Sequence, residues 1–108
     1  MITLINKLKA FGDSNRFRIV MMLKERSLCV CELLKVLDIA GGTLSNHLKI
    51  LKTAGIIKQQ KDGKWIEYFI DPNSIKLVNL IYENLDDKNQ IKADYKIIKN
   101  LSREICSS

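Results

Sequence analysis

Proline, glycine and histidine are scarce in this 108-residue sequence, which contains one proline, five glycines and one histidine. With so few turn-forming residues, long loops are not expected and helices should predominate. No apolar run approaches the roughly 18 residues that a membrane-spanning helix requires. The first residues also lack the charged leader, apolar stretch and cleavage site of a secretory signal peptide. We therefore expect a cytoplasmic protein without a membrane partner.

Cysteine is sparse as well, with three residues at positions 29, 31 and 106. In the cytoplasm such cysteines are typically thiols, metal ligands or redox sites rather than structural disulfides. The remaining composition, with 46% hydrophobic and 28% charged residues, is that of an ordinary globular protein. Since a chain of this length can build one hydrophobic core, residues 1–108 are expected to form a single domain.

The net charge of +6 is concentrated in two segments. Residues 1–26 contain six Lys or Arg against two acidic residues, and residues 43–64 contain five lysines against one acidic residue. The segments 27–42 and 65–108 each have one net negative charge. Basic charge concentrated in this way indicates a polyanionic partner such as a nucleic acid. A solvated lysine-rich face is the alternative that charge alone leaves open.

The spacing of apolar residues predicts a mainly α-helical fold with a small β-hairpin. Helices are expected at residues 2–11, 27–38 and 43–54. A further helix is expected to begin after a cap at Asp13 or Ser14. The run Ala40-Gly41-Gly42 is predicted to be the turn between the helices at 27–38 and 43–54. After the helix at 43–54 the apolar residues recur with a period of two, so residues 57–60 and 65–70 should form a hairpin around Asp62-Gly63. Two further helices are expected after Pro72, one to about residue 85 and one from about residue 90 onward.

The helix at 43–54 is predicted to bury only a narrow edge. At about 100° per residue, Leu44, Leu48 and Leu51 lie within about 60° of one another, whereas the opposite face is polar. A short helix, a glycine-containing turn, a helix with a free polar face and a basic hairpin form, in this order, a winged helix-turn-helix. We place the helix-turn-helix at about 28–54 and the wing at about 56–70.

In this motif the second helix enters the major groove of DNA with its N-terminal residues at the base edges. The predicted base-reading residues are Thr43, Ser45 and Asn46, because asparagine pairs bidentately with adenine and hydroxyls serve several bases. Lys49 and Lys52 lie further along the helix. They are expected to bind phosphates, which position the protein without specifying sequence.

Three other residues near this helix complete the predicted interface. Lys61 and Lys64 at the tip of the hairpin are expected to reach the DNA backbone or the minor groove. His47 lies near the buried edge of the helix. It is predicted to be a packed or phosphate-contacting residue rather than a metal ligand.

Cys29 and Cys31 are predicted at the N-terminus of the helix at 27–38. Unpaired N–H groups and the helix dipole stabilise anions there, so a lowered thiol pKa is expected, and thiolates bind soft, thiophilic ions. In a regular helix these residues lie about 200° apart, so one ion bound by both must distort the first turn. The distortion would reach the DNA-reading helix, which this helix supports. For an isolated Cys-x-Cys pair, small buried hydrophobic residues are the commoner alternative.

Several segments resemble the ArsR/SmtB family of metal-responsive repressors: Leu28-Cys-Val-Cys-Glu-Leu, Thr43-Leu-Ser-Asn-His-Leu-Lys-Ile-Leu-Lys-Thr-Ala-Gly-Ile-Ile and Gly63-Lys-Trp-Ile-Glu-Tyr. The tail Ile97-Ile-Lys-Asn-Leu-Ser-Arg-Glu-Ile-Cys-Ser is similar to that of the arsenical-resistance repressors within this family. The resemblance implies a homodimer, built from helices at about 2–11 and 73–106, that blocks transcription at an operator with dyad symmetry. It implies release by arsenite or antimonite bound to Cys29 and Cys31. The family's DNA-reading positions fall on Thr43, Ser45, Asn46 and His47.

The sequence departs from the family pattern at two places. Many arsenical repressors have a third cysteine one helical turn after the pair, where this chain has Leu34. Cys106 is therefore a candidate third ligand, although we expect arsenite sensing not to require it. The zinc sensors of the family use Asp, His and Glu ligands on the last helix, but the single histidine lies elsewhere. A zinc site of that type is therefore not expected.

Other functions remain as alternatives. The same DNA-binding repressor could sense oxidants, reactive sulfur or another thiophilic metal ion through its cysteines. A thiol oxidoreductase is disfavoured, because such enzymes use Cys-x-x-Cys on a βαβ scaffold and no strand is expected before Cys29. A protein-interaction module is disfavoured by the concentrated basic charge. The sequence therefore predicts a DNA-binding repressor rather than an enzyme.

Overall fold

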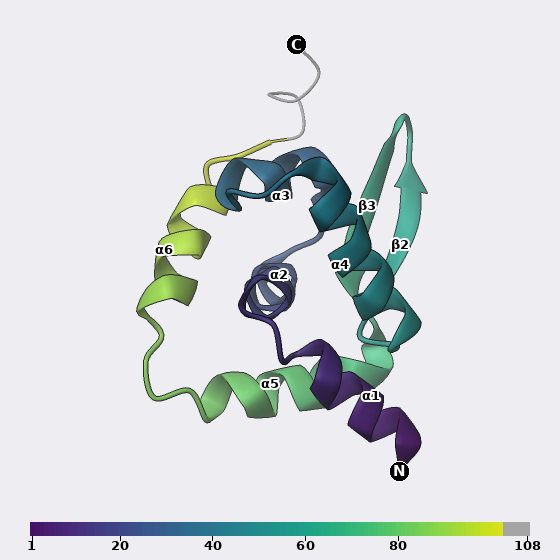
Figure 1. Ribbon diagram of the computed structural model, residues 1–108. Coiled ribbons are helices and arrows are strands. Elements are labelled where there is room, and N and C mark those ends of the chain that lie inside the picture. The colour runs from purple at the N-terminus through teal and green to yellow at the C-terminus, as the bar shows by residue number, and fades with distance from the viewer. Residues whose placement is uncertain (103–108) are drawn as a thin grey trace.

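The computed structural model describes residues 1–102 of the protein (Figure 1). The helices of this part of the chain are α1 (Ile2–Ala10), α2 (Ser14–Glu25), α3 (Val30–Val36), α4 (Gly41–Thr53), α5 (Ile75–Glu83) and α6 (Asn89–Ile98), with a 3-10 turn at Pro72–Ser74. The strands are β1 (Leu28–Cys29), β2 (Ile57–Asp62) and β3 (Trp65–Ile70). This arrangement confirms the prediction of a mainly helical fold with a small hairpin.

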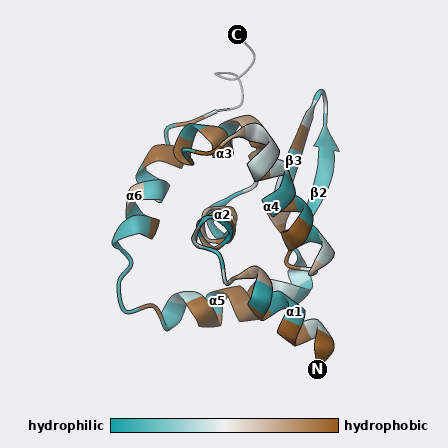
Figure 2. Ribbon diagram, in the orientation of Figure 1, coloured by the Kyte–Doolittle hydropathy of each residue, from teal (hydrophilic) through white to brown (hydrophobic). Residues whose placement is uncertain are grey.

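Helix α2 occupies the centre of the molecule and the other helices surround it (Figure 1). It contacts α4, α5, α6 and β3, and its residues Ile19 to Leu23 are all buried. Buried hydrophobic residues of α3, α4, α5 and α6 complete this core, and α1 contributes Ala10. Figure 2 shows further hydrophobic residues of α1 toward the N-terminus. The side chain of Asp13 caps α2 by accepting hydrogen bonds from the N–H groups of Asn15 and Arg16 at 2.8 and 3.0 Å. The cap predicted at Asp13 or Ser14 is therefore Asp13.

The helix predicted at residues 27–38 begins later than expected, at Val30, so the predicted beginning was wrong. Residues Leu28 and Cys29 form β1, which pairs antiparallel with β3 and places Leu28 opposite Tyr68 and Cys29 opposite Glu67. The sheet thus has three strands in the order β1-β3-β2. Because this strand is held by a partner almost 40 residues away, the local helical spacing did not reveal it.

The predicted turn at Ala40-Gly41-Gly42 was also wrong. Helix α3 already ends at Val36, and Ala40 is the N-cap of α4, so the two glycines form the first turn of α4. Glycine at these positions costs no hydrogen bond of the helix, because the first N–H groups of any helix have no partner within it. Gly55 follows α4 with a positive φ of 83°, which is typical of a glycine that terminates a helix.

The hairpin is longer than the sequence indicated. Asp62 pairs with Trp65, so Gly63 and Lys64 alone form the loop. Gly63 has a φ of 62°, and glycine at the first loop position is typical of a type II′ turn.

At the C-terminal end, α5 stops at Glu83 and α6 at Ile98, earlier than the sequence indicated. Arg18 joins α6 to α2 through two hydrogen bonds of 2.9 Å to the buried carboxylate of Asp94. The remainder of the predicted last helix, including Cys106, lies outside the described residues. None of the helices within residues 1–102 is long and apolar enough to cross a membrane.

Candidate functional site

Helix α4 presents a polar outer face, as the sequence predicted. Leu44, Leu48 and Leu51 are buried against the core. Among the remaining residues of this helix, the exposed side chains are polar or basic: Thr43, Ser45, Asn46, Lys49, Lys52 and Thr53. The helix therefore holds its outer side chains at fixed spacing without needing them for packing.

The β-hairpin lies along one flank of α4 (Figure 1). The ammonium group of Lys52 donates a hydrogen bond of 2.9 Å to Oε1 of Gln59 on β2. Lys61 on β2 and Lys64 in the loop are exposed, and Lys64 Nζ lies 5.1 Å from the centroid of the Trp65 ring. The hairpin thus adds cations beside the polar face of α4.

His47 lies on the inner side of α4 with 8% of its surface exposed. Its Nδ1 is 3.2 Å from Nη1 of Arg16, and its Nε2 is 3.9 Å from Oδ1 of Asp13. Because arginine can only donate, Nδ1 accepts this hydrogen bond, which assigns the ring proton to Nε2. His47 is thus packed on the inner side of α4, whereas the other seven predicted DNA-binding residues are exposed.

Cys29 lies at the junction between β1 and α3. It is the N-cap of α3 and has an extended backbone, so the predicted geometry of two cysteines within one regular helix was wrong. Cys29 is a free thiol with 3% of its surface exposed. Burial raises the pKa of this thiol above its ordinary value. The expected lowering by the helix terminus is therefore overturned, because removal from water outweighs it.

Cys31 follows in the first turn of α3, where it is half-buried. Both cysteines border a pocket of about 590 Å³ between α3 and the hairpin, and its lining also includes Val30, Leu34, Lys64 and Trp65. Leu34 is half-buried at the edge of the core and contributes no sulfur to this pocket. Within residues 1–102, no group of three His, Cys, Asp or Glu side chains could hold a metal ion.

A buried carboxylate that the sequence analysis missed holds the beginning of α3. Glu32, with 1% of its surface exposed, forms an ion pair of 2.7 Å with Arg26. The same Arg26 nitrogen donates to the carbonyl oxygens of Ile98 and Leu101 at 2.9 and 3.0 Å. The spacing of Cys29 and Glu32 matches a capping box in which cysteine replaces the usual serine or threonine, and this pattern could have revealed the role of Glu32.

The chain matches, over residues 13–59, the family model described as bacterial regulatory protein, arsR family. It is 37% identical over 86 residues to the cadmium resistance transcriptional regulatory protein CadC of Listeria innocua, covering 79% of this chain and 71% of that protein. It is 32% identical over 108 residues to the arsenical resistance operon repressor of Escherichia coli, covering 95% of this chain and 88% of that protein.

A solved structure shares the fold. The homodimeric winged helix-turn-helix DNA-binding domain of Mb0332 from Mycobacterium bovis superposes with a TM-score of 0.70 at 21% identity, covering 75% of this chain and 76% of that one. The predicted winged helix-turn-helix is therefore confirmed.

Proposed function

Because the chain belongs to the ArsR family of bacterial regulatory proteins, we propose that it is a homodimeric, cytoplasmic repressor that binds operator DNA and leaves it when arsenite or antimonite binds Cys29 and Cys31. Proteins of this family are DNA-binding transcriptional regulators, not enzymes. The operator, the dimer and the inducer are the proposed parts of this function.

The outer face of α4 supports binding to an operator. Thr43, Ser45 and Asn46 lie in the N-terminal half of this helix, which is the half that meets base edges when a recognition helix enters the major groove. Lys49 and Lys52 follow toward the C-terminal half, where their cations suit phosphates. The hairpin with Lys61 and Lys64 is the wing in this arrangement.

Exposed apolar side chains support a homodimer. Helix α1 exposes Ile2, Leu4, Ile5 and Leu8, and α5 exposes Ile75 and Leu80. Apolar side chains gathered in this way on a small protein indicate a protein interface, and a second copy of the chain is the commonest partner. A two-fold dimer would present two α4 helices to successive major grooves, about 34–36 Å apart.

The position of the two cysteines is the observation that carries the proposed inducer. Cys29 and Cys31 border one pocket at the start of α3, and α3 packs against α4. Thiolates are suitable ligands for a soft ion such as trivalent arsenic or antimony. The relative in Escherichia coli is named for arsenical resistance and that in Listeria innocua for cadmium resistance, which supports an inducer of this chemical type.

The strand that contains Cys29 provides a connection from the inducer to the wing. Cys29 is paired with Glu67 of β3, and β3 is paired along its length with β2. We propose that an ion bound by the sulfurs of both Cys29 and Cys31 shifts β1 or the first turn of α3. Either shift acts on an element of the proposed DNA interface, so inducer and DNA become thermodynamically coupled.

Two cysteines leave the third coordination position of arsenic open. Leu34 cannot fill it, and Cys106 lies outside the described residues. We propose that hydroxide or an added thiol fills this position and that Cys106 is not required. Since thiolates are the ligands, the inducer binds the reduced form of the protein.

An oxidant is the second candidate signal. The partial exposure of Cys31 favours it, because an accessible thiol suits reversible oxidation. The raised pKa of Cys29 opposes direct oxidation of that thiol, since thiolates react faster than thiols. In this second candidate function the DNA interface is the same, and an oxidant rather than a bound ion releases the DNA.

Fluorescence anisotropy with the reduced protein and the DNA upstream of its own gene tests the proposal. We expect preferred binding to this duplex over a scrambled one and release by arsenite in the absence of oxidant. Release by peroxide alone, with arsenite inactive, would instead support the oxidant sensor. Equal affinity for both duplexes would contradict the operator.

A further inference from the structure

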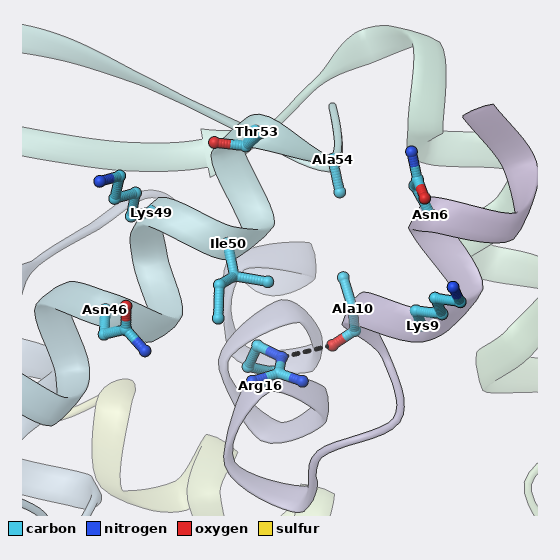
Figure 3. A pocket seen from close by; sticks show the side chains of 9 residues that line it. All are labelled: Asn6, Lys9, Ala10, Arg16, Asn46, Lys49, Ile50, Thr53 and Ala54. Atoms are coloured by element: carbon cyan, nitrogen blue, oxygen red, sulfur yellow. Dashed lines mark hydrogen bonds between the residues drawn. The ribbon is translucent and has the colours of Figure 1, made fainter. Parts of the chain in front are cut away.

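Helices α1, α2 and α4 enclose a groove of about 410 Å³ beside the DNA-reading face (Figure 3). Lys9 of α1, Arg16 of α2 and Lys49 of α4 line this α1–α4 groove, and none of the described residues in its lining is acidic. Asn46, one of the predicted base-reading residues, lies at its edge on α4. The groove is therefore basic and continuous with the proposed DNA interface.

Two hydrogen bonds hold Arg16 in place in the lining of this groove. Its Nε donates a hydrogen bond of 2.8 Å to the carbonyl oxygen of Ala10 (Figure 3), and its Nη1 lies 3.2 Å from Nδ1 of His47. A guanidinium has five N–H donors, so these two contacts leave others for a ligand. An arginine that is already oriented loses little conformational freedom on binding, and its planar fork suits phosphate oxygens.

The groove lies beside α4, where a DNA strand would pass if α4 entered the major groove. It follows α4 from Asn46 to Thr53 on the side of α1, whereas Lys52 lies toward the hairpin and binds Gln59. A helix with its side chains is about 10–12 Å wide, and the major groove is about 12 Å wide. A docked α4 would therefore fill the major groove, with one sugar-phosphate backbone along each flank.

We propose that the α1–α4 groove binds a backbone phosphate of the operator, so that Lys9 and Arg16 are DNA contacts in addition to those of α4 and the wing. This inference rests on the proposed function, since it requires α4 to dock in the major groove. A DNA phosphate is favoured over a small free anion because Asn46 and Lys49 belong both to the groove and to the DNA-reading face. Any occupant of the groove must then lie against the bound duplex.

The salt dependence of DNA binding tests this inference with the full-length reduced protein. The logarithm of the affinity falls linearly with the logarithm of the salt concentration, and each phosphate contact that is lost makes this fall shallower by about 1. We expect this shallower fall for Lys9→Gln, with operator and scrambled duplexes weakened by the same factor. Lys92→Gln is the matched control, because this exposed lysine lies on α6, across α2 from α4 (Figure 1), and its slope should equal that of the wild type.

Phosphate ethylation interference then locates the contact on the DNA. The wild type should be blocked by ethylation at a phosphate flanking each half-site, and Lys9→Gln should lose this interference. Arg16→Gln should lose it too, provided that its thermal unfolding shows a folded protein; Lys9→Gln alone decides the matter if that variant is unfolded. An unchanged slope and interference pattern in Lys9→Gln, with normal operator binding by the wild type, would overturn this inference alone. Failure of the wild type to bind any DNA would overturn the proposed function with it.

Discussion

The backbone N–H of Cys29 donates a hydrogen bond of 3.0 Å to Oε1 of Glu32, which ties the proposed inducer site to a buried carboxylate. The other oxygen of Glu32 accepts a hydrogen bond of 2.7 Å from Arg26. Arg26 in turn donates to the carbonyl oxygens of Ile98 and Leu101. The start of α3 is thus held to the end of α6, and an ion that distorts the first turn of α3 acts against these contacts.

Replacing Glu32 by Gln should weaken this connection. The amide has nearly the same shape but lacks the charge that strengthens the hydrogen bond to Arg26. We expect the free energy of unfolding, measured by urea denaturation, to fall by about 1–3 kcal/mol. Glu25→Gln is the control, because Glu25 makes only a 3.8 Å contact with Lys24 and should change stability by less than about 0.5 kcal/mol. Equal effects of the two substitutions would contradict the role of Glu32.

The stability of the reduced protein should decline in alkaline solution. Burial raises the pKa of the Cys29 thiol above its ordinary value of 9.0, so the folded protein keeps this proton at a pH where the unfolded chain loses it. The contribution is complete below about pH 9 and is lost as the pH rises through the folded-state pKa. Urea denaturation from about pH 8 to about pH 10 should show a smaller decline for Cys29→Ala than for the wild type. Burial also raises the pKa of Tyr68, but that contribution is common to both proteins. Parallel curves would mean that Cys29 does not titrate abnormally.

Asn46 and Lys49 should have different roles in DNA binding. Asn46→Ala should reduce discrimination at one base pair of each half-site by about 1–3 kcal/mol, since the bidentate contact to a base is lost. Lys49→Gln should weaken binding to operator and scrambled duplexes alike, because phosphates carry no sequence information. Competition assays with singly substituted operators measure both effects. If Asn46→Ala weakened operator and scrambled DNA equally, Asn46 would not be a base-reading residue.

The sequence was sufficient to predict elements whose pattern is local. The three leucines of α4 and the Asp62-Gly63 turn predicted the recognition helix and the hairpin, because each pattern lies within a few residues. Strand β1 could not be predicted in this way, since Cys29 is extended only through its pairing with Glu67. A turn was predicted at the two glycines that begin α4, because glycine is frequent in turns.

The same distinction applies to the candidate site. The exposed face of α4 followed from helical periodicity, whereas the pKa of Cys29 depends on burial by distant segments and was predicted in the wrong direction. The bond from Arg26 to the end of α6 joins residues that are more than 70 positions apart. No spacing rule within one segment could indicate it.

The coordination of arsenic should involve two sulfurs. X-ray absorption of the arsenite complex, prepared from reduced protein without added thiol, should show two sulfur atoms and one lighter atom around arsenic. Cys106→Ser should give the same spectrum and respond to arsenite as the wild type does. Three sulfurs in the wild type and two in Cys106→Ser would make Cys106 a ligand.

The release of DNA by arsenite tests the central claim most directly. Reduced wild type, Cys29→Ser and Cys31→Ser are bound to the same fluorescent operator duplex and titrated with arsenite. Both variants should bind the operator with wild-type affinity, since serine has nearly the shape of cysteine and at position 29 is also a favourable N-cap for α3. They should stay bound at arsenite concentrations that release the wild type. Val30→Ala, which alters the same pocket without removing a sulfur, should still be released. Release of either serine variant at the wild-type arsenite concentration would contradict the assignment of Cys29 and Cys31 as the inducer site.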